Sequence, residues 1–387
     1  MKLIHICKDE KFIDDAIYMF ASIKNVDSFF FIYTQNKDGK LNFIKNKSVT
    51  IFTSIKKLLY AVNASKNTFV MLHSLFLPYD KVLKINQPII WNSWGFDIYS
   101  DIEDPLKKIF SLPLYKPQTR SLLKNIQHKD YKLRFLLFVW KMTFLCKKRQ
   151  IEYNRITQKT AYFSTVLPIE FDLITTVFPS AKYCPFHYLA PPTKEYFVQK
   201  NDYAHNNRIL LGNSNDPTNN HLDVLEKLNA LKTTLEIIIP FSYPDKDSYY
   251  SRYLKSHPSV FSYLKITFIH DFLDRDKYFQ LIDSCSIAIF GHLRQQAVGN
   301  INYCLGTGKK VFFYEDSILY RHYQAKGYKI FTIENELSTD NITSSLDSTT
   351  KEHNQDILSN EWNYNNELKS LQLFFNDLNK TQDDNQL

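Results

Sequence analysis

The chain of 387 residues exceeds the roughly 100 to 200 residues of an ordinary domain, which predicts two domains with separate cores. Apolar residues make up 44% of the sequence and aromatic residues 15%, which excludes a disordered chain. The five cysteines form no CxxC pair, and no His cluster has the spacing of metal ligands. We therefore expect reduced thiols in a cytosolic protein, with no metal and no cofactor.

The formal net charge of +8 is unevenly distributed along the chain. Residues 105–159 contain fourteen Lys and Arg against two acidic residues, so this segment carries fourteen minus two, or +12, and the remainder carries −4. The longest apolar stretch, residues 133–146, falls short of the ~20 residues that span a bilayer. The amino terminus also lacks the basic start and long apolar core of a signal peptide, so we expect neither a transmembrane helix nor export.

The first half alternates short apolar runs with amphipathic stretches. The apolar runs are predicted strands at residues 3–7, 29–33, 49–52, 69–72, 88–91 and 161–165, followed by a short run near residues 182–189. Alternation of strands with helical segments is typical of a parallel α/β sheet. We therefore predict a Rossmann-like domain over residues 1–190, which binds the acceptor and docks on the membrane.

The second half repeats this alternation after a Pro- and Asn-rich connection at residues 191–207. Strands are predicted at residues 208–211, 235–239, 265–269, 287–290 and 311–314. Leucines at helical spacing from Leu222 to Leu231 predict a helix, and Asp274 is a candidate cap of another. A second Rossmann-like domain over residues 208–345, which binds the nucleotide, would then face the first across a cleft. Residues 346–387 are expected to be a polar tail around one helical stretch near residues 362–378.

Gly212, Asn213 and Ser214 follow directly on a predicted strand and precede a predicted helix. In an open α/β sheet, ligands bind at the carboxyl ends of strands, and a helix N-terminus there offers N–H groups to a phosphate. Gly212 lets the backbone approach such an anion closely. The alternative interpretation is an ordinary strand-to-helix turn, since Gly, Asn and Ser are common turn residues.

A second loop of the same kind follows the strand at residues 287–290. Arg294, with Gln295 beside it, can hold a diphosphate bidentately, and Gly299 and Asn300 can present N–H groups at the next helix start. The alternative is a surface loop with a solvated arginine. Two such loops in one domain predict a shared site for a nucleotide diphosphate. The absence of a Walker loop and of GxGxxG disfavours ATP-driven phosphoryl transfer and NAD binding.

Other strand ends carry side chains that suit a nucleoside. Tyr243 can stack or hydrogen-bond in the cleft, and the backbone of Phe272 and Leu273 can hold the base. The carboxylate of Glu315 can accept hydrogen bonds from ribose hydroxyls, although a solvated helix cap fits this position as well. These residues are the predicted nucleoside site.

In the first half, Trp94, Gly95, Asp97 and Tyr99 lie together just past a predicted strand. Aromatic faces bind sugar rings, and a carboxylate beside them can remove a proton from an acceptor hydroxyl. His73, at the end of the preceding strand, is the other candidate base. The alternatives are a packed aromatic corner in which Asp97 caps a helix, and a structural histidine.

Residues 131–149 read as one basic and apolar helix. Arg134, Lys141 and Lys148 recur every seven residues and lie on one face, while apolar side chains cover much of the rest. Such a helix can lie in an anionic membrane interface, at ~1 kcal/mol per basic residue. A buried helix with snorkelling lysines is an equal alternative. Nucleic acid fits least well, because the positive charge adjoins an apolar run better suited to lipid.

Many of these residues together resemble a known family, the TDP-4-acetamido-4,6-dideoxygalactose:lipid II transferases of enterobacterial common antigen synthesis, glycosyltransferase family 56. The likeness covers most of the chain, with matching order and spacing. In the second half it rests on residues 211–214, Asn220, His221, Pro240, Tyr243, Pro244, Arg294, Gln295, Gln296 and Gly299. In the first half it rests on His73, Phe76, Pro78, Trp94, Gly95, Asp97 and Tyr99. The basic segment at residues 115–150 looks expanded, and a serine stands where a glycine is expected after the histidine.

The resemblance implies a GT-B fold, a TDP-sugar donor such as TDP-Fuc4NAc (the 4-acetamido-4,6-dideoxygalactose) or a relative, and a polyprenyl-diphosphate-linked acceptor. It places the enzyme on the cytoplasmic face of the bacterial inner membrane, where it builds the common antigen, an O-antigen or a capsule. Arg294 and the loop amides would stabilise the departing diphosphate without a metal. Asp97, or failing it His73, would be the general base if the anomeric centre inverts. The competing hypothesis is a peripheral membrane module that binds a nucleotide or polyanion without catalysis.

Overall fold

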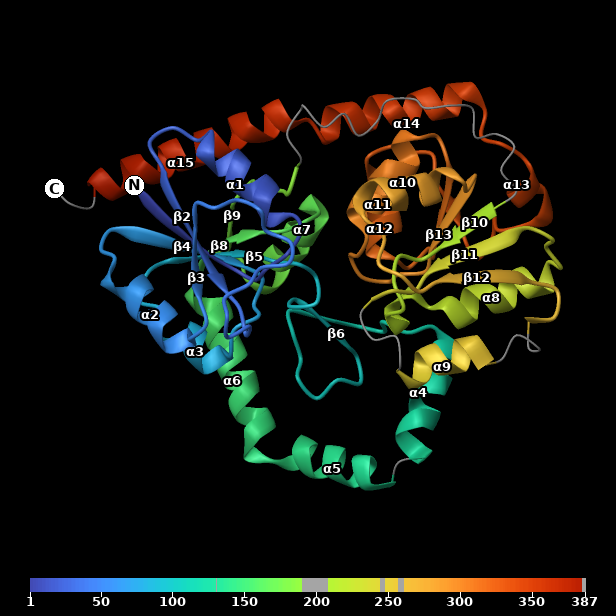
Figure 1. Cartoon of the computed structure of the whole chain (residues 1–387), viewed down its shortest axis with the longest axis horizontal. Helices are drawn as coiled ribbons and strands as arrows, with labels where there is room; N and C mark the ends of the chain where they lie inside the picture. Colours follow the sequence, from blue (N-terminus) through green and yellow to red (C-terminus); the bar gives the residue numbers. More distant parts are fainter. Residues whose placement is uncertain (130, 190–207, 244–247, 257–260, 385–387) are drawn as a thin grey trace.

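The computed structural model describes residues 1–129, 131–189, 208–243, 248–256 and 261–384. Two α/β lobes lie side by side, each built on its own parallel sheet (Figure 1). The five cysteines are buried as free thiols, as expected. The predicted α/β class with two Rossmann-like domains is confirmed.

The N-terminal lobe contains a seven-stranded sheet in the order β3-β2-β1-β4-β5-β8-β9, with every pair parallel. Its strands are β1 (Lys2–Cys7), β2 (Asp27–Tyr33), β3 (Val49–Phe52), β4 (Thr68–His73), β5 (Ile89–Asn92), β8 (Thr160–Ser164) and β9 (Lys182–Tyr183). All residues of β4 and β5 are buried, as is usual where crossover helices cover both faces of a parallel sheet. The predicted strands before residue 165 lie within two residues of the observed ones.

The C-terminal lobe contains a six-stranded parallel sheet in the order β12-β11-β10-β13-β14-β15. Its strands are β10 (Arg208–Leu211), β11 (Glu236–Pro240), β12 (Lys265–Ile269), β13 (Ile287–Phe290), β14 (Lys310–Phe313) and β15 (Phe331–Thr332). The first five were predicted to within one residue. The two-residue β15 was missed because it is too short to show a period.

Helices connect the strands of both lobes. The N-terminal lobe has α1 (Ile13–Ala21), α2 (Ile55–Ala64), α3 (Tyr79–Val82) and α7 (Pro168–Val177). The C-terminal lobe has the 3-10 turn η1 (Pro217–Asn219), then α8 (His221–Ala230), α9 (Tyr249–Ser256), α10 (Arg275–Asp283), α11 (Val298–Gly306), α12 (Ile318–Ala325) and α13 (Thr339–Thr343). Asp274 caps α10 as predicted, because its Oδ1 accepts a hydrogen bond from Lys277 N at 3.0 Å.

A long insertion between β5 and β8 crosses from the N-terminal lobe to the C-terminal lobe (Figure 1). It contains the parallel pair β6 (Tyr99–Asp101) and β7 (Phe110–Leu112), then α4 (Pro117–Lys129), α5 (Tyr131–Met142) and α6 (Phe144–Lys159). The α4 helix packs against the C-terminal lobe, where the Asp223 carboxylate accepts hydrogen bonds from Gln118 N and Thr119 N at 2.8 and 3.0 Å. No local sequence pattern predicts this crossing.

The single basic helix predicted at residues 131–149 is wrong. The chain forms two helices that are interrupted at Thr143, whose backbone is extended and whose hydroxyl donates to Trp140 O at 2.8 Å. Lys141 and Lys148 therefore lie on different helices, and Arg134 falls outside the residues whose side chains are described. Among the described helices, none combines the length and the apolar character that crossing a membrane requires.

The carboxyl-terminal region forms two helices rather than one. The α14 helix (Ser348–Glu361) lies on the C-terminal lobe, and α15 (Tyr364–Asp384) returns along the N-terminal lobe (Figure 1). The α15 side chains Leu371, Phe375 and Leu378 are buried in the core of that lobe. The N-terminal core is therefore completed by residues from the far end of the chain, and α15 ties the two lobes together opposite α5.

Candidate active site

Two loops of the C-terminal lobe meet at the point where the strand order of its sheet reverses. From the adjacent strands β10 and β13, the chain runs outward in opposite directions, to β11 and β12 on one side and to β14 and β15 on the other. Ligands of open α/β sheets bind in the crevice at such a switch point. Residues 212–214 leave β10 here and residues 291–297 leave β13. Gln296 Nε2 donates to Asn213 Oδ1 at 3.0 Å, so the two predicted phosphate loops are in direct contact.

The first of these loops is shaped from below by Asn219, which is fully buried. Asn219 Oδ1 accepts hydrogen bonds from Asn213 N at 3.0 Å and from His292 Nε2 at 2.7 Å. Asn219 Nδ2 donates to Ser214 Oγ at 3.2 Å and to Asp216 O at 2.9 Å. One amide side chain thus holds the backbone of residues 213–216 in place. This role of Asn219 was not predicted, because in the sequence the residue lies in what looks like an ordinary polar turn.

Gly212 is required by this packing. Its φ of +68° lies in the left-handed region, and a Cβ at this position would lie 2.4 Å from Asn219 Oδ1 and 3.1 Å from His221 Nε2. Such a distance from Oδ1 is far inside van der Waals contact. The Asn219 side chain occupies the space that a larger residue would need, so the glycine is explained by this packing, and its predicted close approach to an anion stays a prediction.

Arg294 is the candidate anion-binding side chain of the second loop. It is half-buried, and its only hydrogen bond within the described residues runs from NH1 to Gln295 O, at 3.0 Å. Within the same residues it has no ion-pair partner. Burial lowers the pKa of Arg294 and the charge of Asp216 opposes this, but a guanidinium stays ionised in proteins. An arginine without a counter-ion beside a phosphate-type loop can bind an anion bidentately.

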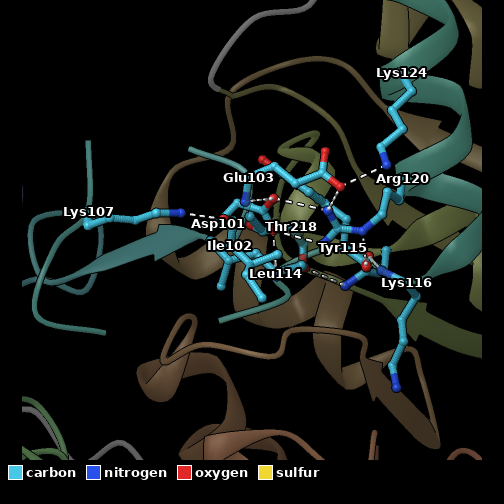
Figure 2. A network of polar contacts seen from close by, with 11 residues as sticks. Asp101, Ile102, Glu103, Lys107, Leu114, Tyr115, Lys116, Arg120, Lys124 and Thr218 are labelled. Carbon is cyan, nitrogen blue, oxygen red and sulfur yellow. Dashed lines mark hydrogen bonds and ion pairs between the residues drawn. The ribbon is translucent and has the colours of Figure 1, made fainter. Parts of the chain in front are cut away.

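A second basic region lies nearby, between α4 and the C-terminal lobe. It surrounds a pocket of about 550 Å³ that is lined by Pro113, Tyr115, Lys116, Pro117, Arg120, Ser121, Lys124, Asn125, Leu293 and Asp316. Its cations already have partners. Lys116 pairs with Asp316 at an N–O distance of 2.9 Å, and Figure 2 shows the pairs Arg120–Asp101 at 2.9 Å and Lys124–Glu103 at 2.7 Å. These pairs fix the insertion, so Arg294 remains the better candidate for the anion.

The aromatic segment of the N-terminal lobe contacts the Arg294 loop. Gly95 has a φ of +86°, and a Cβ there would lie 2.7 Å from Gln295 Oε1 and 2.9 Å from Gln295 O. Trp94 is half-buried, and its Nε1 donates to the Tyr188 hydroxyl at 3.0 Å. Tyr99 is buried, with its hydroxyl beside Glu170. The predicted acceptor segment and the predicted diphosphate loop are thus neighbours across the lobes.

The remaining predicted donor residues differ in how close they lie to the loops. Gly299 is exposed in the first turn of α11, with open space where a Cβ would be, whereas the Asn300 amide is turned to the Tyr278 hydroxyl at 2.9 Å. Tyr243 is 68% exposed, and its carbonyl accepts from Asn215 N at 2.8 Å, which places it beside the first loop.

Two nucleoside candidates sit further out. The Phe272 ring, next to the half-buried Leu273, is exposed and lies 6.2 Å from the ring of Phe43 in the other lobe. Glu315 is exposed, and its amide donates to Glu334 Oε2 at 3.0 Å. The contacts within the described residues do not join Glu315 to Tyr243 or Phe272.

Asp97 is 3% exposed, and its carboxylate has three donors. Oδ2 accepts from Leu75 N at 2.9 Å and from Trp91 Nε1 at 2.8 Å, and Oδ1 accepts from Trp94 N at 2.9 Å. Burial raises the pKa of Asp97, and these hydrogen bonds oppose the rise. Such a carboxylate fixes the loops that follow β4 and β5. Its role as a general base stays a prediction, and its lack of exposure disfavours that role.

His73 is fully buried at the end of β4. One ring nitrogen, Nε2, is hydrogen-bonded to His5 Nδ1 at 3.0 Å, and Nδ1 is hydrogen-bonded to the Tyr188 hydroxyl. Burial lowers the pKa of His73 to about 3, so that the ring is neutral at physiological pH. Its role as a base also stays a prediction, since in this structure the ring does not reach the surface. Within the residues that the structure describes, no three His, Cys, Asp or Glu side chains gather as a possible metal site.

Comparison with known families identifies the chain. The family described as 4-alpha-L-fucosyltransferase, glycosyl transferase group 56, matches residues 140–373, which is more than half of the sequence. The protein belongs to glycosyl transferase group 56. The resemblance seen in the sequence is thereby confirmed, and the protein is a glycosyltransferase.

Solved structures show the fold of this group 56 enzyme. They include the Anabaena protein HepE in complex with UDP and glucose, at 10% identity and a TM-score of 0.59, covering 98% of this chain and 100% of that one. Sucrose-phosphate synthase from Thermosynechococcus elongatus has 9% identity and a TM-score of 0.59, with coverage of 98% and 100%. A glycosyltransferase from Rickettsia africae has 11% identity and a TM-score of 0.51, with 98% of both chains covered. At these identities the likeness establishes the GT-B fold alone.

A further carboxylate of the group 56 enzyme lies near Arg294 and was not predicted. Glu170, at the start of α7, is fully buried, and its Oε2 accepts from Leu167 N at 3.0 Å. Burial raises the pKa of Glu170 to about 7, against the opposing effects of that N–H and of the Tyr99 hydroxyl. In the sequence, Glu170 looks like an ordinary acidic residue at the start of a helix. Its complete burial, which the sequence does not indicate, is what sets it apart.

Replacing Glu170 by Gln is expected to stabilise the enzyme at high pH. Because the folded state holds this proton up to about pH 7 while the unfolded chain releases it near its ordinary pKa of 4.5, stability falls as pH rises between these values. The loss is up to about 1.4 kcal/mol per pH unit. Glutamine keeps the acceptor for Leu167 N and does not titrate. Urea unfolding at pH 5 and pH 8 should therefore show the variant's advantage growing with pH, and an advantage equal at both pH values would contradict this.

Proposed function

We propose that the enzyme transfers a deoxy or acetamido sugar, Fuc4NAc or a relative, from a TDP-sugar to a polyprenyl-diphosphate-linked saccharide in surface polysaccharide synthesis. The observation that carries the proposal is the contact between Asn213 and Gln296, which joins two phosphate-type loops. Beside them lies Arg294, whose positive charge has no ion-pair partner within the described residues. Group 56 membership supports transfer of a sugar, and HepE, of the same fold, was solved with UDP and glucose. The choice of TDP and of Fuc4NAc rests on the family resemblance.

In the proposed reaction the donor diphosphate lies between the two loops. Gly212 N and Asn213 N already donate to Ile289 O and to Asn219 Oδ1, so the amides proposed to face the phosphates are Ser214 N and the start of α11 at Gly299. Arg294 binds the phosphates bidentately. As the bond to the sugar breaks, negative charge grows on the leaving diphosphate, and these fixed donors stabilise it. The cation is supplied by Arg294, so we propose that no metal is needed.

The nucleoside and the acceptor are proposed to occupy the two sides of this centre. Tyr243 is an exposed aromatic side chain beside the first loop, and Phe272 is an exposed one further out on the same lobe, and both can stack on the base. Trp94 presents a half-buried aromatic face on the opposite lobe, close to Gly95 and the Arg294 loop. A sugar acceptor stacked there would lie near the donor sugar.

The membrane side of the proposal rests on a surface that we call the α5 patch. It consists of eight exposed apolar side chains, namely Phe135, Leu136, Phe138, Val139, Met142, Phe144, Leu145 and Ile151. Exposed basic residues, Lys141, Lys147 and Lys148, border it. Exposure on this scale disfavours the buried helix with snorkelling lysines, and the mixture of apolar and basic side chains suits an anionic lipid surface. We therefore propose a peripheral place on the cytoplasmic face of the inner membrane.

Replacing Phe135, Phe138 and Met142 together by serine is expected to abolish binding to vesicles that contain anionic lipid. Each removed side chain takes away on the order of 1.5–3 kcal/mol of apolar burial in the interface. Co-sedimentation with vesicles of phosphatidylethanolamine and phosphatidylglycerol measures the loss. Tyr60→Ser, at an 80% exposed position on α2, is the matched control and should bind like the wild type. Equal binding by the triple variant would rule out this surface.

The function itself is tested by incubating the purified enzyme with a panel of TDP- and UDP-sugars and a bacterial lipid extract. Label from a TDP-sugar should enter the lipid fraction, and slow hydrolysis of the same donor should occur without acceptor. If TDP binds but neither transfer nor hydrolysis occurs with any donor, a non-catalytic module that binds a nucleotide at the membrane becomes the better interpretation.

A further inference from the structure

The N-terminal sheet has a switch point of its own. Strands β1 and β4 are neighbours, and the strand order runs outward from them to β2 and β3 on one side and to β5, β8 and β9 on the other. Residues 8–12 after β1 and residues 74–76 after β4 leave these strands at their carboxyl ends, where the switch-point rule expects a crevice. By the rule that locates the diphosphate site in the other lobe, this crevice is where the N-terminal lobe should meet its substrate.

The loop after β1 is packed onto the aromatic segment of the candidate site. The ring of Phe12 lies 4.8 Å from that of Trp94 and 4.6 Å from that of Tyr188. On the other side of the loop, Lys8 Nζ lies 5.3 Å from the centre of the Phe76 ring. Residues 9–11 are thus held at the mouth of the crevice, next to the surface proposed for the acceptor sugar.

The same loop borders the C-terminal lobe. Asp9 Oδ1 accepts from Phe43 N at 3.1 Å and from Ile44 N at 3.0 Å, which fixes Phe43 opposite Phe272, with 6.2 Å between the ring centres. Residue 10 therefore lies between the aromatic segment of one lobe and the nucleoside loops of the other. The Asp9 carboxylate is therefore occupied by backbone amides.

In the loop after β1, Glu10 is the acidic side chain that does not hold another segment of the protein in position. It is half-buried, and within the described residues its carboxylate makes no hydrogen bond and no ion pair. In contrast, Asp9 and Asp97 each bind several backbone amides. The charge of Glu10 acts on the hydroxyls of Tyr188 and Tyr243, which lie on opposite lobes. Burial raises the pKa of Glu10 while Lys8 and Lys11 lower it and Asp9 raises it further.

We propose that Glu10, rather than Asp97 or His73, is the base that accepts the proton of the acceptor hydroxyl. This rests on the proposed function. In a direct displacement, the acceptor oxygen forms a bond to the anomeric carbon while the bond from that carbon to the diphosphate oxygen breaks. The electron pair of the broken bond leaves with the nucleoside diphosphate, and the hydroxyl proton passes to the Glu10 carboxylate.

The test compares transfer rates and TDP binding for Glu10→Gln and for Asp27→Asn, an exposed carboxylate of β2. Glu10→Gln should lower kcat by about 10²–10⁴-fold, the usual contribution of a positioned base, and leave the Kd of TDP unchanged. The wild-type kcat should fall on the acid side as the carboxylate is protonated, and the variant should lack this limb. Asp27→Asn should match the wild type throughout.

Chemical rescue separates a base from a side chain that only supports the fold. Formate added to Glu10→Ala should restore part of the lost transfer, because it can take the proton in the space left by the side chain. A wild-type rate for Glu10→Gln, a parallel loss of TDP binding, or the absence of any rescue would each overturn the assignment of Glu10. If the wild type itself transfers no sugar, it is the proposed function that fails.

Discussion

Arg294→Ala should lower kcat for sugar transfer by about 10²–10³-fold, the usual effect of removing one preorganised group that stabilises developing charge. Arg294 is half-buried at the switch point of the C-terminal sheet and has no counter-ion among the described residues. In the transition state the leaving diphosphate provides a counter-ion for Arg294. Arg294→Lys should keep part of the rate, because lysine supplies the charge without the bidentate geometry. Transfer assays and TDP titration calorimetry measure both effects.

The control for Arg294 is Arg252→Ala, an exposed position on α9. Its rate and its affinity for TDP should equal those of the wild type. Arg294→Ala should also remain folded, since among the described residues the Arg294 side chain makes one hydrogen bond, to the carbonyl of the next residue. A variant of Arg294 that is folded and transfers sugar at the wild-type rate would mean that the diphosphate is bound elsewhere.

Gly212→Ala is expected to destabilise the C-terminal lobe and to weaken TDP binding together. An alanine at φ +68° carries the strain of the left-handed region, and its Cβ would also sit 2.4 Å from Asn219 Oδ1. Relieving that contact displaces the side chain that holds the amide of Asn213. We expect TDP affinity to fall by on the order of tenfold or more, as when a hydrogen bond to a charged ligand is lost.

Gly39→Ala is the matched control for this substitution. Gly39 has a φ of +71°, but a Cβ there would find its nearest neighbour, in Ile51, at 3.6 Å. This control should lose only the ~1–2 kcal/mol of left-handed backbone strain and bind TDP normally. Urea unfolding and calorimetry of both variants separate strain from the clash. If Gly212→Ala behaved like Gly39→Ala in both measurements, the close packing of the loop on Asn219 would be refuted.

The strands and the position of the two phosphate loops at their carboxyl ends could be read from the sequence, for a physical reason. Strands buried on both faces appear as short apolar runs, and those at residues 208–211 and 287–290 coincide with β10 and β13. Polar and glycine residues that follow such runs must lie at the carboxyl edge of the sheet. That β10 and β13 are adjacent was not visible in the sequence, but it is what brings Asn213 and Gln296 together.

Other parts of the site depend on long-range packing that leaves no local pattern. The α4 helix reads as a polar segment of the first domain, yet Asp223 of the second lobe caps it. Asp97 looked like an available base, but the Trp91 indole and two backbone amides enclose it. Glu170 shows the converse, since a common helix-start residue is buried close to Arg294. Asp223 lies 105 residues from Gln118, so spacing along the chain carries no trace of that contact. By contrast, Trp91 and Trp94 lie within six residues of Asp97 and match the packed aromatic corner that was the alternative interpretation.

A crystal structure with TDP bound would test the shared diphosphate site most directly. We expect one phosphate against the amide of Ser214 and the Arg294 guanidinium on both phosphates, with the base toward Tyr243. A diphosphate that lies instead in the pocket beside Lys116, or that makes no contact with Arg294, would contradict the site described for this enzyme.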